Sequence, residues 1–179
     1  MNTVQIGDEF ELKSYELIKK AVEDDQLGIS PKNSRVFRKK GYFSRKGNRN
    51  ILFDLSIEVW PPNAERYSIL CIIECKSYSS KKVPVDDIEE FLFKLIQIAD
   101  QGFFVKGIFI TNSSFQQGAL ELGKNTGLMM IEINTDNKLD IKFHKTERKE
   151  ASVQDEVSEE LETFIHGIFN LNVVEGLKN

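Results

Sequence analysis

Residues 68–77 read Ser-Ile-Leu-Cys-Ile-Ile-Glu-Cys-Lys-Ser, and this stretch decides the fold. Its apolar run, 69–73, is typical of a central strand that is covered on both faces of a sheet. Glu74 and Lys76 end the run, and because they are two residues apart on a strand they point to the same face. A carboxylate and an ammonium group at the end of a buried strand are costly unless something uses them. The pattern therefore indicates a chemically active strand end, with a cross-strand ion pair on a solvated face as the alternative.

The elements expected around this strand have the order of an α/β fold. Apolar residues at helical spacing predict three helices, over residues 6–25, 85–99 and 114–125. Strand patterns bounded by turn residues predict further strands over residues 35–44, 51–60, 107–112, 128–133 and 139–144. Three successive strands followed by a β-α-β crossover give an αβββαβ core, in which helices flank a central mixed β-sheet.

The chain of 179 residues is expected to hold one domain, over residues 1–146. Residues 147–179 form an extension, which we interpret as an acidic linker and an amphipathic helix over residues 157–171. That C-terminal helix packs either on the same domain or on a dimer partner, and the sequence leaves both alternatives open.

Composition limits the classes of protein that the chain can represent. Hydrophobic residues make up 40% and charged residues 29%, as in soluble globular proteins. No apolar run has the length of a membrane span, and the first ten residues do not resemble a signal peptide. Cys71 and Cys75 lie four residues apart on one strand, too far to form a disulfide easily. We therefore expect a cytoplasmic protein with reduced thiols and no membrane partner.

A metal site is predicted where Asp54 and Glu74 meet. Asp54 lies within the expected strand 51–60, and if that strand neighbours 68–77 the two carboxylates converge. Carboxylates without a nearby imidazole suit a hard cation such as Mg²⁺, for which Mn²⁺ can substitute, and the carbonyl of Cys75 offers a third oxygen. Lys76 would hold the attacking water and offset the charge of the transition state in phosphodiester hydrolysis. The alternative for Asp54 is a turn or strand-end acceptor.

Asp54 followed by Glu74-Cys75-Lys76 resembles the D…(D/E)-x-K motif of the PD-(D/E)xK nuclease superfamily, and the Mrr-like restriction endonucleases are the most similar branch. Residues 7–11, Gly-Asp-Glu-Phe-Glu, are similar to the G-x-x-F-E opening of that branch's first helix. This resemblance implies an active-site role for Glu11, with Glu9 and Glu16 as competing acids. Residues 109–119 resemble a later strand and helix of the branch. Two departures are Phe53 in place of Pro, and Glu74 where the branch often has Gln.

A basic cluster precedes the Asp54 strand. Between residues 32 and 49 the chain carries eight Lys or Arg residues and no acid, although the net charge of the whole chain is −4. We interpret part of this cluster as a phosphate-binding surface, and an ordinary solvated hairpin is the alternative. The residues assigned to nucleic-acid binding are Arg38, Lys39, Lys40, Arg45, Lys46 and Arg49.

These patterns favour a metal-dependent DNA endonuclease, as in defence against foreign DNA. An RNase, a nuclease activated by a partner or ligand, and a silent nucleic-acid-binding module with the same fold stay open as alternatives. A homodimer would supply the two active sites that cutting both strands of a duplex needs. No P-loop or dinucleotide-binding motif supports a nucleotide cofactor. Two further positions, Tyr78 and Gln97, are weaker candidates for the site.

Overall fold

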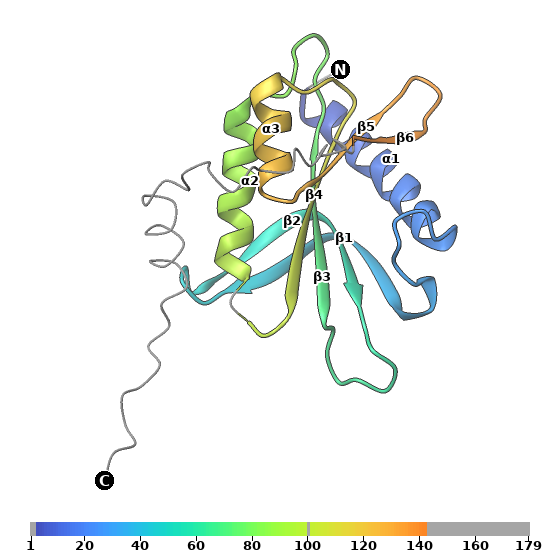
Figure 1. Ribbon diagram of the computed structural model, residues 1–179, viewed down its shortest axis with the longest axis vertical. Helices are drawn as coiled ribbons and strands as arrows, with labels where there is room; N and C mark the ends of the chain where they lie inside the picture. Colours follow the sequence, from blue (N-terminus) through green and yellow to red (C-terminus); the bar gives the residue numbers. More distant parts are fainter. Residues whose placement is uncertain (1–2, 100, 143–179) are drawn as a thin grey trace, which may run out of the picture. The chain divides into compact units, whose positions relative to one another are not determined.

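The computed structural model describes residues 3–99 and 101–142 (Figure 1). Its helices and strands, in chain order, are α1 (Thr3–Glu23), the 3-10 helix η1 (Pro31–Asn33), β1 (Ser34–Ser44), β2 (Arg49–Val59), β3 (Ile69–Lys76), α2 (Val85–Ile98), β4 (Phe104–Thr111), α3 (Gln117–Asn125), β5 (Met129–Ile133) and β6 (Leu139–Ile141). Every helix and strand predicted within the described residues is present, with ends shifted by a few residues. The short helix η1 was not predicted. The expected linker and helix of residues 147–171 lie outside the described residues.

The six strands form one mixed sheet in the order β1-β2-β3-β4-β5-β6. Strands β1, β2 and β3 are antiparallel neighbours, β3, β4 and β5 are parallel, and β6 returns antiparallel to β5. The prediction of an αβββαβ core with a central mixed sheet is therefore confirmed. As predicted, β3 is a central strand, since residues 70–74 are all buried.

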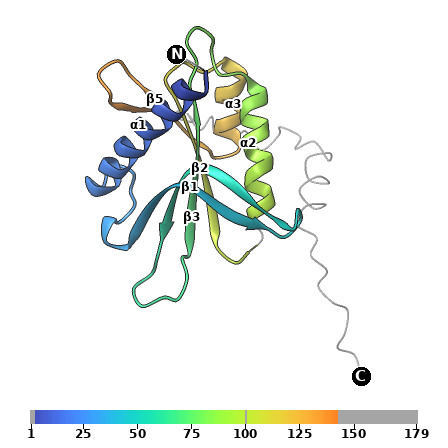
Figure 2. The ribbon, with the colours of Figure 1, turned by 180° about the vertical axis from the view of Figure 1, so that it is seen from behind.

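Helices cover both faces of the sheet, which is why β3 is apolar on both sides. Helix α1 packs on one face, and α2 and α3 pack on the other (Figures 1 and 2). Along β3 the side chains alternate between the two cores: Leu70 and Ile72 lie on the α2 side, and Cys71 and Ile73 on the α1 side. Cys71 and Cys75 are free thiols, as expected.

The β1–β2 hairpin twists halfway along its length. Val36 and its partner Ile57 pack on the α1 side, whereas Tyr42 and its partner Ile51 pack on the α2 side. Val36 and Tyr42 are an even number of residues apart along β1, and so are Ile51 and Ile57 along β2. Regular strands would therefore keep the two residues of each strand on one face. The exchange occurs around Lys39, which has φ of +50° and lies between the residues paired with Leu55 and Phe53, opposite Asp54.

A buried polar network connects the two halves of this twisted hairpin. The carboxylate of Glu58, only 2% exposed, accepts hydrogen bonds from Tyr42 Oη (2.9 Å), Lys40 Nζ (2.6 Å) and Trp60 Nε1 (3.3 Å). The Tyr42 hydroxyl also lies 2.8 Å from Ser56 Oγ. Lys40 and Tyr42 lie in the half of the hairpin next to its turn, residues 40–53. Ser56 and Glu58 lie in the other half, so the network connects the two halves across the twist at which Asp54 lies.

Among the described residues, no helix combines the length and the apolar character that a membrane crossing requires.

Candidate active site

Asp54 lies at the point where the ladder between β2 and β3 ends. The antiparallel pairing stops at Leu55 and Ile73. One step further, the backbone N–H of Cys75 donates a hydrogen bond to Asp54 Oδ2, over 2.8 Å. A side-chain carboxylate has thus replaced a backbone carbonyl as the partner of β3. Asp54 and Glu74 therefore flank this opening in the sheet, as the prediction of neighbouring strands required.

Glu74 is buried at the end of β3 and is flanked by two lysines. Its side chain lies on the edge of the α2 side, and the residue is 6% exposed. Glu74 Oε1 lies 3.5 Å from Lys76 Nζ and 3.0 Å from Lys94 Nζ. Lys94 belongs to α2 and also forms an ion pair with Glu90, one helical turn earlier, over 3.0 Å. Two cations from different elements therefore hold one carboxylate oxygen.

The electrostatics of Asp54 and Glu74 are coupled. Burial raises the pKa of Asp54, although the hydrogen bond from Cys75 opposes this shift. Burial, followed by the charge of Asp54, raises the pKa of Glu74 despite the lowering effects of Lys94 and Lys76. The ionised form of each carboxylate is thus disfavoured in the metal-free protein, and a bound cation would relieve that cost.

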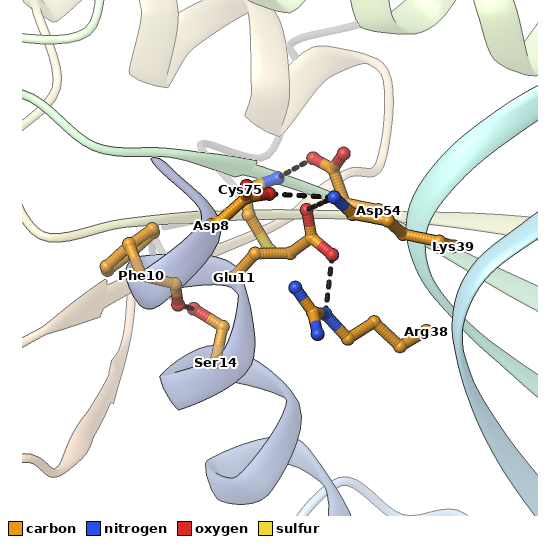
Figure 3. Close-up of polar contacts among 8 residues, drawn as sticks. All are labelled: Asp8, Phe10, Glu11, Ser14, Arg38, Lys39, Asp54 and Cys75. Carbon is orange, nitrogen blue, oxygen red and sulfur yellow. Dashed lines mark hydrogen bonds and ion pairs between the residues drawn. The ribbon is translucent and has the colours of Figure 1, made fainter. Parts of the chain in front are cut away.

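Helix α1 brings Glu11 to the same region (Figure 3). Glu11 is 6% exposed, and its charge contributes to the raised pKa of Asp54. Its carboxylate lies 2.8 Å from Arg38 Nε and 3.6 Å from Lys39 Nζ, so β1 holds it in place. Two other acids of α1 compete for this role in the sequence, and both are exposed: Glu9 and Glu16. Among the three acids, the structure places Glu11 beside Asp54.

Cys75 offers its backbone to the site and not its thiol. The thiol packs on the α1 side, where burial raises its pKa well above the ordinary range, so it is a poor metal ligand. In a strand the N–H and C=O of one residue face the same neighbour, so the carbonyl of Cys75 faces the opening beside Asp54. Two carboxylates and a carbonyl oxygen match the ligand preference of Mg²⁺.

Water would have to complete the coordination of such a cation. Within residues 3–99 and 101–142, no group of three or more His, Cys, Asp or Glu residues is arranged to hold a metal ion. Mg²⁺ typically retains several waters and takes only one or two carboxylates from the protein. The donor set at the opening therefore fits Mg²⁺ better than a metal that needs a complete protein cage.

The predicted nucleic-acid-binding residues fall into two groups. Arg38 and Lys39 pair with acids of α1, Glu11 and Asp8, and Lys40 pairs with the buried Glu58. Arg38 and Lys39 thus hold the hairpin against α1, and Lys40 connects the two strands of the hairpin. The remaining three are exposed around the hairpin turn: Arg45, Lys46 and Arg49.

Lys94 is the site residue that the sequence prediction missed. The available signal was weak, because a Glu90–Lys94 pair at i, i+4 is common on solvated helix faces. Gln97, the predicted candidate on this helix, lies three residues beyond Lys94, and in the described part of the chain the hydrogen bond and ion pairs of Glu74 go to Lys94 and Lys76 instead. Tyr78 has a structural role: its hydroxyl donates to Asp87 and its N–H donates to Asn112 Oδ1 over 2.9 Å, which anchors the loop after β3.

Comparison with solved structures finds similarity at low identity. A repair endonuclease from Pyrococcus abyssi is 16% identical (TM-score 0.41, covering 64% of this chain and 46% of that chain). The MspJI restriction endonuclease, solved in complex with a 27-mer oligonucleotide, is 15% identical (TM-score 0.45, 73% and 26%). A protein of unknown function is 14% identical (TM-score 0.44, 64% and 56%). The chain thus spans between about a quarter and little more than half of these proteins.

Comparison of the sequence itself assigns the family. No curated protein matches the chain significantly. The family model Mrr_cat, described as restriction endonuclease, matches residues 34–139, which are more than half of the chain. The match includes Asp54, Glu74, Lys76 and Lys94, and it leaves out Glu11 and the rest of α1. This chain therefore belongs to the Mrr_cat family of restriction endonucleases.

Proposed function

We propose that this nuclease is a Mg²⁺-dependent endonuclease that hydrolyses phosphodiester bonds in DNA, with Mn²⁺ as a substitute cation. The observation that carries the proposal is the position of Asp54 and Glu74 at the end of the β2–β3 ladder. Burial disfavours the ionised forms of both carboxylates, and so does the charge of a neighbouring acid, Glu11 for Asp54 and Asp54 for Glu74, as expected of groups that await a cation.

Asp54, Glu74 and the carbonyl oxygen of Cys75 would hold the cation. When bound, Mg²⁺ supplies Lewis-acid polarisation of a phosphate oxygen and a water of lowered pKa. Asp54 Oδ2 is already fixed by the N–H of Cys75, so its other oxygen is available at the opening. Glu11 adds a third negative charge beside Asp54 and, because Arg38 and Lys39 hold it, has a positioning role.

Lys76 would act on the attacking water and on the phosphate. Its side chain is 30% exposed, and its ammonium group lies 3.5 Å from Glu74, at the solvent side of the site. It can orient the attacking water and stabilise the charge that develops on the phosphate in the transition state. Lys94 is more buried, and burial alone lowers its pKa, but the charge of Glu74 and the hydrogen bond to Glu90 raise it overall. Lys94 therefore stays charged, and its charge opposes the effects that raise the pKa of Glu74.

The exposed cations of the hairpin turn would bind the phosphate backbone of the substrate. Arg45, Lys46 and Arg49 lie outside the internal ion pairs that engage Arg38, Lys39 and Lys40, so they are available for phosphates. Contacts of this kind give affinity without sequence information and weaken with salt.

The test is cleavage of supercoiled plasmid, single-stranded DNA and RNA in Mg²⁺ or Mn²⁺. We expect DNA to be cut, and EDTA or Lys76→Ala to abolish cutting. Lys82→Ala is the matched control, because Lys82 is an exposed lysine in the loop after β3 and should leave the rate unchanged. Cleavage of RNA alone would change the substrate class. A wild-type protein that cuts nothing and shows no Mg²⁺ or Mn²⁺ binding in calorimetry would overturn the metal site. Linear product from plasmid would accord with a homodimer, which sedimentation would test.

A further inference from the structure

The far half of the β1–β2 hairpin, residues 40–53, has one face that no described residue covers. Tyr42, Ile51 and Phe53 face the α2 side and belong to its core. The alternating side chains of the strands project from the opposite face. On that face Phe43 is 47% exposed and Leu52 is 63% exposed. We call it the open hairpin face.

The open hairpin face leads from the active site to the hairpin turn. Leu52 precedes Asp54 by two residues, which places it about 7 Å from the site along the strand. Phe43 is paired with Asn50, four residues from Asp54, or about 13 Å away. The exposed cations Arg45, Lys46 and Arg49 follow at the turn. Two large apolar side chains thus lie between a cluster of cations and the catalytic carboxylates.

Hydrogen bonds behind the face anchor its backbone and its buried neighbour. The side-chain amide of Gln101 donates a hydrogen bond to the backbone carbonyl of Phe43. The neighbouring Tyr42 is 5% exposed and hydrogen-bonds to Ser56 and Glu58. A surface that is ordered before a ligand arrives loses little entropy on binding. Exposed apolar groups on such a surface are therefore suited to specific contact.

We propose that the open hairpin face binds unpaired bases of the substrate next to the cut, with Phe43 and Leu52 contacting the bases and the turn cations holding the phosphates. An intact duplex presents mainly phosphates and sugars to a flat surface, whereas unstacked bases offer apolar faces to aromatic and aliphatic side chains. At the duplex rise of about 3.4 Å per nucleotide, these distances correspond to about two to four nucleotides from the scissile phosphate, and to fewer where the unpaired strand is extended. The substrate class is a nucleic acid with single-stranded or locally opened bases. This inference rests on the proposed nuclease function.

Binding is measured by fluorescence anisotropy in EDTA, with labelled single strands and blunt duplexes of the same sequence. We expect tighter binding to the single strand, and a loss of about tenfold or more in the Phe43→Ala/Leu52→Ala variant, the scale of one or two base contacts. The slope of affinity against salt should stay unchanged in this variant and fall in Arg45→Ala/Arg49→Ala. Ile96→Ala is the matched control: Ile96 is 56% exposed and lines a groove between α2 and β4.

Three results of the binding and sedimentation measurements would overturn the proposal. One is equal affinity of the double variant and wild type for single strands. Another is an equal loss in Ile96→Ala. The third is a change from dimer to monomer in the double variant by sedimentation, which would make the face a contact between two copies of the chain. If the wild type cuts DNA with Mg²⁺ and the double variant cuts every substrate as fast as the wild type does, the nuclease function stands and this inference fails. If the protein binds single strands in a way that depends on Phe43 but cuts nothing, the binding role of the face stands and the nuclease function fails.

Discussion

Glu58 and Glu74 are two buried carboxylates on neighbouring strands, yet their surroundings differ. Glu58 receives hydrogen bonds from two neutral groups, Tyr42 and Trp60, and from Lys40. Among the described residues, the ion-pair partners of Glu74 are the lysines Lys76 and Lys94, and Glu74 lies beside Asp54, whose charge helps to raise its pKa. The donors to Glu58 reach both of its carboxylate oxygens, Oε1 from Lys40 and Tyr42 and Oε2 from Trp60. Glu74 is held in place but is left with an unfavourable carboxylate neighbour.

This difference separates a structural acid from a functional one. Burial alone does not make the distinction, because the exposed fractions are 2% and 6%. A buried carboxylate is normally stabilised by the hydrogen bonds around it, as Glu58 is. A second carboxylate at the same place, with Lys76 at the solvent side, fits the cation and the phosphate that we propose for the site of Glu74.

The largest expected effect separates the two acids by activity. Glu74→Gln should reduce cleavage on the order of 10³-fold or more, the scale of a single charge-stabilising group. Glu58→Gln should stay within a few-fold of wild type once both proteins are folded, because Glu58 does not contact the opening at Asp54. Single-turnover cleavage at saturating Mg²⁺ measures both. An equal loss in Glu58→Gln would break the comparison, because it would give the hairpin network a direct part in catalysis.

Lys94→Met should reduce cleavage about 10- to 100-fold, the usual effect of removing a group that orients a metal ligand. The physical reason is that Glu74 loses the ammonium group that lies 3.0 Å from Oε1 and favours its ionised form. The apparent affinity for Mg²⁺, measured from the cleavage rate against Mg²⁺ concentration, should change along with the rate. Lys82→Met serves as the control, and a wild-type rate in Lys94→Met would show that Lys76 alone is sufficient.

The two substitutions should rank in the opposite order for stability: Glu58→Gln should lower the free energy of unfolding more than Glu74→Gln does. Glu58→Gln places an amide N–H₂ against a buried donor, and leaving such a group unsatisfied costs about 1–3 kcal/mol. The free energy of unfolding should fall by that amount in urea denaturation in EDTA. Glu74→Gln should lose less, because it removes a charge that burial and Asp54 disfavour. Equal losses in the two variants would contradict the assignment of Glu58 to the structure of the hairpin.

The smallest effect concerns the pH dependence of the metal-free protein. Because the pKa of Asp54 is raised above its ordinary value of 3.8, the folded state binds this proton more tightly than the unfolded state. The stability that the proton confers is present below pH 3.8 and is lost as the pH rises through the raised pKa. Asp54→Asn keeps an acceptor for the N–H of Cys75 and should not show this loss. Unfolding temperatures in EDTA should therefore favour Asp54→Asn increasingly as the pH rises from about 4 to 7, and a constant difference would contradict it.

The central part of the site was predictable from local sequence. An apolar run that ends in Glu74 and Lys76 predicts a covered strand with charged groups at its end, and β3 has this form. The position of Asp54 near the end of β3 was also predictable, because consecutive antiparallel strands are usually neighbours. The elements themselves were predictable because their periodicity and turn residues agreed.

Other features depend on tertiary structure and have no local signal. The twist of the hairpin requires φ of +50° at Lys39, a residue type that does not favour such a backbone. Tertiary contacts stabilise it, namely the network around Glu58 and the ion pairs of Lys39 with α1. The contact between Lys94 and Glu74 depends on how α2 lies across the sheet. The division of the basic cluster depends on α1, whose acids engage Arg38 and Lys39.

The left-handed residue in β1 has a consequence for behaviour in solution. β1 is an outer strand of the sheet and is 11 residues long, so its free edge could template pairing with another chain. The interruption at Lys39 breaks that edge into two short segments that face different ways, and lysines and arginines line it. The opposite outer strand, β6, has only three residues. The same distortion that places Asp54 in the site thus also protects the sheet against edge-to-edge aggregation.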